Sequence, residues 1–468
     1  MKNFEPLTRF LRERFDESAL AGLSAAIAGP DGLLYTFNAG FIDAAHSRRP
    51  DPDTVFGVGS LSKSFTALSL ALLHAEGRLH IDDPAARYVP GFRFPGVAPD
   101  AITLRHLCTH TSGLPPMELL EWSSAMNSPG RSDPETLALR AQSPGRFSSM
   151  EDLLDYIAHC PYPPTGQPGE TMSYSNEGYA VLSSAVDAAA GMPLEDFLQE
   201  RVFAPLGLSR TILDSGIDAT RRLAAGNLTS LFTRQDGSLI CDDSWSVLPG
   251  YRGCAMIRST ARDLSRYYSV LASRGRFRGQ VLPGEAVELM IGADYPLQEA
   301  PFMCMGLYKR NYAGHVLCTH AGGLHGVSAL GAFLPDEGIG FSVLCNQGGE
   351  NVDGFLYPMI HFILGLPLDR SPEWFHPVPG SCPRMEDLCG CYQAHEGLTT
   401  ELTLAPGGRM SWNGSPLEVT YCGGGRFLAR SSSGDTLHLE FLTRGSRAWG
   451  VRVGSRVHHL IPSPSTFS

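Results

Sequence analysis

The chain has 468 residues, a length that favours two or three domains and that can bury a large core. Hydrophobic residues make up 43% and charged residues 18%, and the 51 glycines and 34 prolines predict many turns, so a disordered or low-complexity chain is excluded. The formal net charge is −11 and no run of Lys or Arg occurs, which excludes a typical nucleic-acid partner and favours a small-molecule or short-peptide partner.

Three further features exclude classes of protein. Eleven cysteines, an odd number that lies mostly in apolar segments, predict reduced thiols rather than a disulfide framework. Met1–Pro6 has no apolar signal-peptide core and no stretch of roughly 18 apolar residues occurs, so we expect no membrane partner and a cytoplasmic location. His106 and His110 are four residues apart, but no Glu follows His106 as in a His-Glu-x-x-His site, so neither a metal nor another cofactor is predicted.

In chain order, the first predicted elements are a β-hairpin and a helix. The apolar segments Leu23–Ala28 and Leu33–Phe37 flank a Gly-Pro-Asp-Gly turn, which is a hairpin signal. From Ser60 to about Glu76 apolar residues recur at helical spacing, and Gly77 provides a stop. This helix should face the core and should open with a polar turn that carries a lysine.

Residues 100 to 230 predict a helical region with long connections. Helical patterns cover Met150–Ala158, Tyr179–Ala189 and Pro193–Phe203, and Pro- and Gly-rich segments such as Ser128–Phe147 separate them. Long loops often line binding sites, so we expect this region to form one side of a cleft.

The last part of the chain predicts the rest of a sheet and then a separate β domain. Strand patterns cover His315–His320, Val327–Leu334 and Ile339–Asn346, and a helix follows at Asp353–Leu364. Residues 368–380 are typical of a linker, and residues 381–468 show short alternating strands with Gly turns. The expected domains are therefore 1–367 and 381–468, the second a small antiparallel β-barrel, lipocalin-like, or a sandwich.

The most informative segment contains Ser60 and Lys63. Three residues apart on a helix, the two side chains share a face with Cβ atoms about 5 to 6 Å apart, so the amine can reach the hydroxyl. The helix N-terminus favours a developing alkoxide, and burial lowers a lysine pKa from about 10.4 towards that of a useful base. Only three of the 37 basic residues are lysines, which makes a chance Ser-x-x-Lys pair uncommon, although a surface pairing stays an alternative.

Two further segments carry polar groups suited to the same chemistry. Tyr174 and Asn176 form a Tyr-x-Asn turn, in which a phenol with its pKa lowered from about 10 by a nearby ammonium relays a proton and the carboxamide holds a substrate carbonyl. His320 ends a strand, and Gly322 and Gly323 allow a substrate backbone to lie close. Each segment alone is common in proteins without such a role.

Together, the three segments resemble the Ser-x-x-Lys, Tyr-x-Asn and Lys-Thr-Gly-type elements of the serine β-lactamase and penicillin-binding protein superfamily. The chain is most similar to the class C β-lactamase-related branch, which includes D-aminopeptidases, DD-peptidase-like enzymes and esterases. Residues 76–84, 102–114 and 259–264 also match that branch, and the resemblance covers about residues 10–365.

The resemblance implies an α/β fold in which an antiparallel sheet flanked by helices meets an all-helical region, with the cleft between them. It also implies that Ser60 attacks a substrate carbonyl and that Lys63 and Tyr174 share the proton transfer. Backbone N–H groups of Ser60 and Gly323 would form the oxyanion hole, and water would hydrolyse the acyl-enzyme. The implied substrate-binding residues are Asn176, His320, Gly322 and Gly323.

The chain departs from the superfamily at one position. Where β-lactamases and transpeptidases carry Lys-Thr-Gly, this sequence has His320-Ala321-Gly322, so a neutral imidazole replaces the cation that grips a substrate carboxylate. His-x-Gly resembles the D-aminopeptidase-like members, and the favoured function is therefore amide hydrolysis in small peptides that contain D-residues. A carboxylesterase, a weak β-lactamase and an inactive binding protein are the alternatives, and a homo-oligomer is compatible with the sequence.

The sequence leaves the recognition of the substrate open. A free substrate amine needs an acidic or carbonyl partner, and the candidates lie in the loops of residues 117–149 or in the C-terminal barrel. A substrate carboxylate would instead need a cation, for which Arg252, Arg258 and Arg310 are the candidates. For the barrel we expect a role in limiting substrate size.

Overall fold

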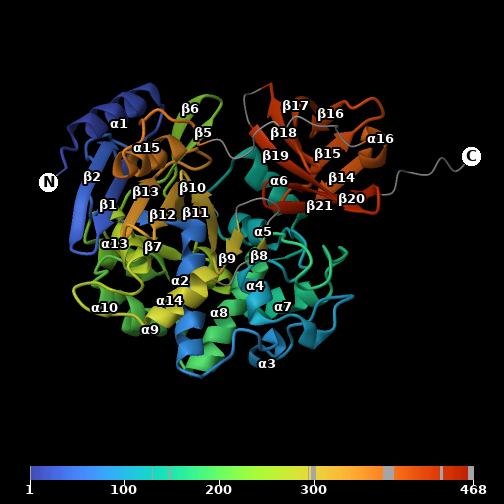
Figure 1. Ribbon diagram of the computed structural model, residues 1–468, viewed down its shortest axis with the longest axis horizontal. Coiled ribbons are helices and arrows are strands. Elements are labelled where there is room, and N and C mark those ends of the chain that lie inside the picture. Colours follow the sequence, from blue (N-terminus) through green and yellow to red (C-terminus); the bar gives the residue numbers. More distant parts are fainter. Residues whose placement is uncertain are drawn as a thin grey trace, which may run out of the picture.

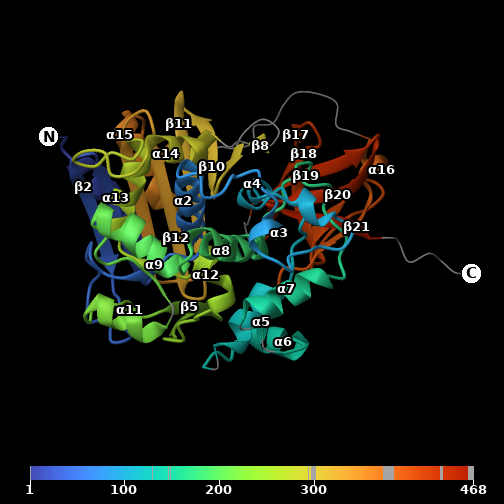
Figure 2. The same ribbon diagram turned by 90° about the horizontal axis from the view of Figure 1, so that it is seen from below.

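The computed structural model describes residues 2–128, 130–145, 147, 149–214, 216–292, 295–296, 302–372, 384–432 and 436–461. This part of the chain forms an α/β and helical unit and a closed β-barrel, which lie side by side in both views (Figure 1; Figure 2). The predicted fold class is confirmed, because an antiparallel sheet flanked by helices adjoins a helical region and a C-terminal antiparallel barrel follows.

The first unit is built on an eight-stranded antiparallel sheet in the order β2-β1-β13-β12-β11-β10-β9-β8. Its strands are β1 (Gly22–Gly29), β2 (Gly32–Gly40), β8 (Tyr295–Pro296), β9 (Phe302–Cys304), β10 (Leu307–Tyr312), β11 (His315–Leu324), β12 (Val327–Leu334) and β13 (Ile339–Cys345). β1 pairs with β13, so the hairpin near the N-terminus and the last strands of the unit complete one sheet, as the sequence predicts.

Helices cover both faces of this sheet (Figure 1). α1 (Glu5–Glu17) and α15 (Asp353–Leu364) pack on one face, and α13 (Ala261–Ala272) packs on the other, with α2 (Ser62–Ala75) in the same core. Because both faces are covered, β1 is buried along its whole length and consists of small and apolar residues instead of an alternating pattern.

The helical region contributes most of the remaining helices. They are α3 (Ala85–Tyr88), α4 (Leu104–Cys108), α5 (Leu119–Met126), α6 (Pro134–Gln142), α7 (Met150–Ala158), α8 (Asn176–Ala190), α9 (Leu194–Leu198), α10 (Ala204–Leu206), α11 (Ile217–Ala224), α12 (Arg252–Ala255) and α14 (Gly284–Gly292). α8 begins where the Ser175 hydroxyl accepts a hydrogen bond from the Gly178 N–H at 3.1 Å, and it ends at Gly191 in the left-handed conformation. The cap fixes the position of the Tyr-x-Asn turn.

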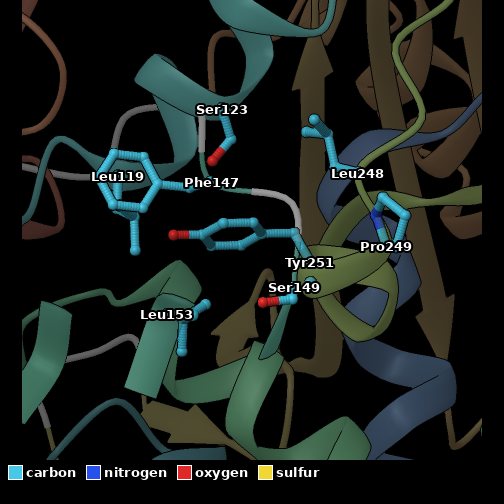
Figure 3. A pocket seen from close by; sticks show the side chains of 9 residues that line it. Leu119, Ser123, Phe147, Ser149, Leu153, Leu248, Pro249 and Tyr251 are labelled. Carbon is cyan, nitrogen blue, oxygen red and sulfur yellow. The ribbon is translucent and has the colours of Figure 1, made fainter. Parts of the chain in front are cut away.

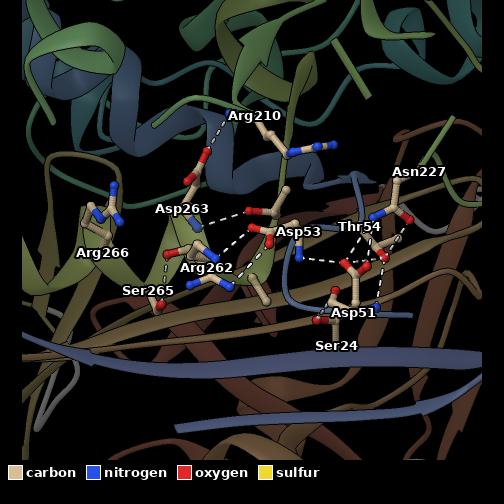
Figure 4. A network of polar contacts seen from close by, with 12 residues as sticks. Ser24, Asp51, Asp53, Thr54, Arg210, Asn227, Arg262, Asp263, Ser265 and Arg266 are labelled. Carbon is tan, nitrogen blue, oxygen red and sulfur yellow. Dashed lines mark hydrogen bonds and ion pairs between the residues drawn. The ribbon is translucent and has the colours of Figure 1, made fainter. Parts of the chain in front are cut away.

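A polar network fixes the segment that leads to Ser60 (Figure 4). Arg262 donates hydrogen bonds of 2.7 and 3.2 Å to the Asp53 carboxylate, and Asp51 accepts hydrogen bonds from a neighbouring threonine and asparagine. Beyond this anchor, β3 (Phe56–Gly57) pairs with β7 (Ile257–Ser259), which also pairs with β4 (Ile212–Leu213). A 3-10 turn over Gly59–Leu61 then runs into α2, so Ser60 precedes the α-helix instead of opening it.

The C-terminal unit is a closed barrel of eight antiparallel strands. They are β14 (Gly390–Ala394), β15 (Thr400–Leu404), β16 (Met410–Trp412), β17 (Ser415–Gly423), β18 (Arg426–Ser431), β19 (Thr436–Arg444), β20 (Arg447–Val453) and β21 (Arg456–Ile461), preceded by α16 (Met385–Leu388). Tyr392, Leu402, Phe427 and Leu439 are fully or almost fully buried in the barrel core, in keeping with the alternating pattern. Of the predicted linker, residues 373–380 lie outside the described residues.

Two smaller observations complete the fold. β5 (Phe232–Gln235) and β6 (Ser238–Cys241) form a separate hairpin. Across the residues with a described structure, no helix has the length and apolar character needed to cross a bilayer, and the ten cysteines among them form no disulfide.

Candidate active site

Lys63 is the centre of the polar contacts around Ser60. Its ammonium nitrogen Nζ donates hydrogen bonds to Ser60 Oγ at 3.0 Å, to Asn176 Oδ1 at 2.9 Å and to the Cys254 carbonyl at 3.2 Å. The structure thus brings together the Ser-x-x-Lys and Tyr-x-Asn segments, 113 residues apart in sequence. The Cys254 carbonyl, from α12, is a contact that the sequence does not indicate.

Burial tunes the Lys63 amine. The side chain is fully buried, and the loss of hydration lowers its pKa from 10.5 to about 8, with a further lowering from the Arg456 guanidinium. The Cys254 thiol and the carboxylates of Glu396 and Glu177 oppose this shift. Because the pKa is close to neutral pH, a useful fraction of Lys63 carries a free lone pair and can accept a proton from Ser60.

The Tyr174 phenol lies within hydrogen-bonding reach of the Ser60 hydroxyl. Its ring packs against the imidazole of His110, at 4.1 Å between centroids, and against the guanidinium of Arg456, at 4.1 Å from the ring centroid. Burial raises the pKa of Tyr174 above its ordinary value, although Arg456 acts in the opposite direction. The lowering expected from sequence is therefore wrong, because desolvation of the phenolate outweighs the nearby cations, and the phenol keeps its proton at neutral pH.

Asn176 connects Lys63 with the barrel. It is the first residue of α8, its carboxamide oxygen accepts the hydrogen bond from Lys63, and its Nδ2 donates to Glu396 Oε1 at 3.0 Å. Both ends of the carboxamide are thus engaged, which fixes its orientation at the edge of the site.

His320 lies on β11 and faces the same place. Its side chain is 3% exposed, its Nδ1 lies 2.6 Å from the Ala321 carbonyl, and no described residue hydrogen-bonds its Nε2. Burial, and then the Lys63 charge, lower the His320 pKa to about 3, so the ring is neutral. Because Nδ1 must carry the hydrogen to donate to the carbonyl, Nε2 presents a lone pair that accepts hydrogen bonds.

The two glycines after His320 differ in their surroundings. A Cβ on Gly322 would lie 2.0 Å from the Val58 carbonyl oxygen, so β11 packs directly on the turn that carries Ser60. A Cβ on Gly59, whose φ is +52°, would lie 2.7 Å from the Gly323 nitrogen. A Cβ on Gly323 itself would meet nothing within 4 Å. The backbone of Gly323 is therefore adjacent to the Ser60 turn, and its α-carbon faces open space.

The barrel supplies residues that sequence reasoning missed. Arg456, the first residue of β21, donates hydrogen bonds from Nε and Nη2 to Glu396 at 2.5 and 2.6 Å, and it covers the Tyr174 ring. The Tyr174 N–H also donates to the Ser455 carbonyl at 2.8 Å. No local pattern marks Glu396 or Arg456, because their role depends on which face of the barrel meets the first unit.

A cavity of about 920 Å³ opens onto the side of Ser60 away from the buried Lys63. Ser60, Tyr174, Asn176, His320, Gly322 and Gly323 all line it. Its volume lies within the range of small-molecule sites and suits a short peptide. Its charged lining includes Glu121 of α5, Arg131, Arg234, Glu350, Glu396 and Arg456.

Two of the arginines proposed from the sequence are engaged elsewhere. Arg258 is 1% exposed and donates to Asp214 at 3.2 Å, and Arg252 forms ion pairs with Asp187 and Glu195. Neither lines the cavity, and nor does Arg310. Local sequence does not distinguish a structural arginine from one that faces a substrate.

A second, much smaller cavity lies between α5, α7 and the turn before α12 (Figure 3). Its volume is about 10 Å³, and Figure 3 shows the Tyr251 ring between Leu119 and Leu153. The Tyr251 hydroxyl donates to the buried Glu177 carboxylate at 3.2 Å. This space admits a water molecule at most, so the large cavity is the candidate site.

The histidines considered as metal ligands have structural contacts. The His106 ring accepts a hydrogen bond from the Thr103 N–H at 3.2 Å and caps α4, while His110 Nδ1 accepts one from the Ser175 N–H at 3.1 Å. Each ring thus accepts one hydrogen bond from a backbone N–H of its own unit.

Comparison with known proteins decides the family. The model of the Beta-lactamase family matches residues 7–362. The chain belongs to the Beta-lactamase family. It is 26% identical over 364 residues to penicillin-binding protein 4* of Bacillus subtilis (strain 168), which covers 74% of this chain and 73% of that protein. It is 33% identical over 201 residues to esterase EstB of Burkholderia gladioli, covering 42% and 47%.

Solved structures extend the likeness of this Beta-lactamase family member to the barrel. The octameric penicillin-binding protein homologue from Pyrococcus abyssi matches with a TM-score of 0.67 and 19% identity over 98% of this chain and 100% of that chain. A D-stereospecific amidohydrolase from Streptomyces sp. matches with a TM-score of 0.58 and 22% identity over 74% and 95%. These likenesses show the fold, and membership of the Beta-lactamase family makes the protein a serine hydrolase.

Proposed function

We propose that the protein hydrolyses amide bonds of small peptides that contain D-residues, through an acyl-enzyme on Ser60. The observation that carries this proposal is that a base and an acid meet at one hydroxyl: the Lys63 amine at 3.0 Å and the protonated Tyr174 phenol. An amide needs both groups, because an amine departs only after it has been protonated, whereas an activated ester needs only the base.

The first step forms the acyl-enzyme. The neutral Lys63 amine takes the proton of Ser60 as the serine oxygen bonds to the substrate carbonyl carbon. The carbonyl oxygen becomes an oxyanion, which the N–H groups of Ser60 and Gly323 stabilise, and each such donor is worth a factor of about 10² to 10³ in rate. The carbon–nitrogen bond then breaks, Tyr174 protonates the leaving nitrogen, and the Lys63 ammonium returns a proton to Tyr174.

The second step releases the product. A water molecule attacks the acyl carbon as the neutral Lys63 amine takes its proton, and the Ser60 oxygen leaves and is reprotonated by the Lys63 ammonium, directly or through Tyr174. His320 accepts a hydrogen bond at Nε2 from an N–H of the substrate, which satisfies the buried lone pair. Asn176 orients the acyl side through the carboxamide that Lys63 and Glu396 hold in place.

The neutral His320 side chain favours peptide substrates over β-lactams that carry a carboxylate. His320 stands where related enzymes carry a lysine, and its low pKa leaves no positive charge there at physiological pH. The likeness to a D-stereospecific amidohydrolase supports a D-residue in the substrate.

Paired nitroanilides test the proposal. We expect nitroaniline release from D-alanyl p-nitroanilide to exceed release from L-alanyl p-nitroanilide, and the Ser60→Ala variant to release neither above the uncatalysed rate. Equal release from the two enantiomers would contradict the D-preference, and release by Ser60→Ala would contradict the nucleophile.

A carboxylesterase is the second candidate, because the chain is 33% identical over 201 residues to esterase EstB. The same experiment separates the two functions. If neither anilide is cleaved while a short-chain nitrophenyl ester is hydrolysed through Ser60, the esterase assignment replaces the peptidase assignment.

We also propose a cytoplasmic location and self-association. The described part of the chain holds ten cysteines and no disulfide between them, which supports the location, because thiols persist in a reducing compartment. The octameric Pyrococcus abyssi homologue supports the second. Light scattering of the purified chain measures the oligomeric state directly.

A further inference from the structure

The Glu121 carboxylate lies at the active-site cavity without a partner among the residues that the structure describes. Glu121, on α5, lines the cavity with Ser60, and no described residue hydrogen-bonds or ion-pairs with its carboxylate. Burial raises the pKa of Glu121 to about 7, and the Glu396 carboxylate adds to this shift. A carboxylate in such surroundings gains most from a cationic ligand, because a positive charge stabilises its ionised form.

The barrel places a second carboxylate beside the first. A Cβ on Gly397 would lie 2.9 Å from Glu121 Cγ, so the loop that carries Glu396 rests on the Glu121 side chain. Gly397 has a φ of +78°, a conformation that glycine adopts without strain. Glu121 and Glu396 are therefore neighbours from two different units of the protein.

The cations near this pair are already engaged. Arg456 is bound to Glu396 and to the Ser455 hydroxyl, and Arg131 pairs with Asp133 at 3.3 Å. Glu135 of α6 adds another negative charge that faces Glu121. With Arg456 paired to Glu396 and Arg131 paired to Asp133, the negative charges of Glu121 and Glu135 are left without a paired cation among the described residues.

A chain of contacts places the pair on the acyl side of the site. Ser60 contacts Lys63, Lys63 contacts Asn176 at 2.9 Å, and Asn176 contacts Glu396 at 3.0 Å. A group bound by Glu396 and Glu121 therefore lies beyond Asn176, on the side that holds the acyl portion in the proposed mechanism. The sequence left two regions as candidates for binding a substrate amine, residues 117–149 and the barrel, and each contributes one of the two acids.

We propose that Glu121 and Glu396 form a binding site for the ammonium group of the substrate's acyl portion. This inference rests on the proposed function and deepens it: the preferred substrates are peptides or amides with a free amine on the acyl side. An ammonium donates three hydrogen bonds, and two carboxylates accept them while the positive charge removes their mutual repulsion. N-acylated and des-amino substrates lose both contributions.

A matched substrate pair tests the site. D-alanyl p-nitroanilide carries the amine, propionyl p-nitroanilide lacks only that amine, and both are measured at pH 7 with the wild-type chain, Glu121→Gln and Glu350→Gln. Glu350 lines the same cavity and hydrogen-bonds Gln347, so its variant removes a charge from the cavity without touching the pair.

We expect the wild type to prefer the amine substrate in kcat/KM by about tenfold or more, the range of a charge-assisted hydrogen bond. Glu121→Gln should reduce this ratio by about tenfold. Glu350→Gln should keep it. A ratio near one in the wild type, or loss of the ratio in Glu350→Gln but not in Glu121→Gln, would overturn the site.

Failure of the two proposals is distinguishable in the same assay. If the wild type cleaves both anilides through Ser60 with equal kcat/KM, the ammonium site is wrong and the amide hydrolase stands. If it cleaves neither anilide, the proposed function fails first. Because glutamine keeps the size of Glu121 and no hydrogen bond is lost, thermal unfolding of Glu121→Gln should match the wild type and confirm that the variant is folded.

Discussion

At the scale of single residues, the proposed mechanism makes the rate depend on the protonation state of Lys63. The base must be neutral to accept the Ser60 proton, and burial lowers its pKa to about 8. We therefore predict that kcat/KM for the uncharged substrate 4-nitrophenyl acetate rises with pH through about 8 and then levels off. A stopped-flow or plate assay from pH 6 to 10 measures this limb, and a profile that falls across this range would contradict Lys63 as the base.

Removing the charge of Arg456 or of Glu396 should shift the rising limb of this pH profile in opposite directions. Arg456 lowers the Lys63 pKa and Glu396 raises it, because one is a cation and the other an anion. We predict that Arg456→Gln moves the limb to higher pH and Glu396→Gln moves it to lower pH. The same ester assay detects both shifts, and shifts in the same direction would show that charge at the barrel face does not act on Lys63.

Sequence reasoning reached the residues of the motifs but not their environment. The Ser60–Lys63 contact was predictable from the spacing, although Ser60 lies in the 3-10 turn before α2. The sign of the Tyr174 pKa shift depends on burial, which no local pattern gives. Glu396 lies 220 residues from Asn176, so its hydrogen bond depends on tertiary structure. Residues of the candidate site that lie outside a motif can be identified only from the tertiary structure, which brings distant parts of the chain together.

At the scale of elements, the contact between the end of β11 and the 3-10 turn determines where Ser60 lies. A methyl group at Gly322 meets the Val58 carbonyl at 2.0 Å, whereas one at Gly323 meets nothing within 4 Å. We predict that Gly322→Ala lowers both stability and activity, because backbone must move away from the nucleophile. Gly323→Ala should keep the stability and lower kcat/KM, because its methyl group occupies substrate space.

Urea unfolding and ester hydrolysis measured on the two alanine variants separate these effects. The destabilisation of Gly322→Ala should be about 1 to 3 kcal/mol, the usual cost of overpacking. Equal stability of both variants would contradict the close packing of β11 on the turn.

Element bounds were predictable where the sequence pattern was strong and turn residues marked both ends. α7, β12 and α15 have the bounds that their patterns predict. The predicted start of the helix at Ser60 differs from the structure, because the segment before α2 forms a tighter 3-10 turn after β3 pairs with β7. Nearly all of α2 is buried, so its apolar pattern does not show where that turn ends. The exact start of a helix depends on such connections.

At the scale of the whole molecule, the barrel contributes residues to the candidate active site. The Ser455 carbonyl holds the Tyr174 backbone, and Glu396 holds Asn176. The sequence predicted a separate β domain that limits substrate size, and its contribution to the polar contacts at the nucleophile adds a second role. The two roles make different predictions for a chain that ends before Met385.

We predict that this shortened chain loses at least about tenfold in kcat/KM for D-alanyl p-nitroanilide, because misplacing catalytic groups by about 1 Å costs up to about a hundredfold. Its remaining activity should discriminate less between dipeptides and longer peptides. Circular dichroism establishes whether the shortened chain is folded. If it is not, the single variants Arg456→Gln and Glu396→Gln in the full chain test the same contacts. Unchanged activity and unchanged size selectivity in a folded shortened chain would contradict both roles.

The most direct test of the mechanism is the covalent intermediate. After 4-nitrophenyl acetate is mixed with the enzyme and quenched in acid during turnover, peptide mass spectrometry should find one acetyl group on the peptide that contains Ser60, and none in Ser60→Ala. An acetyl group on another residue, or continued turnover without any acyl-enzyme on Ser60, would contradict the assignment of Ser60 as the nucleophile.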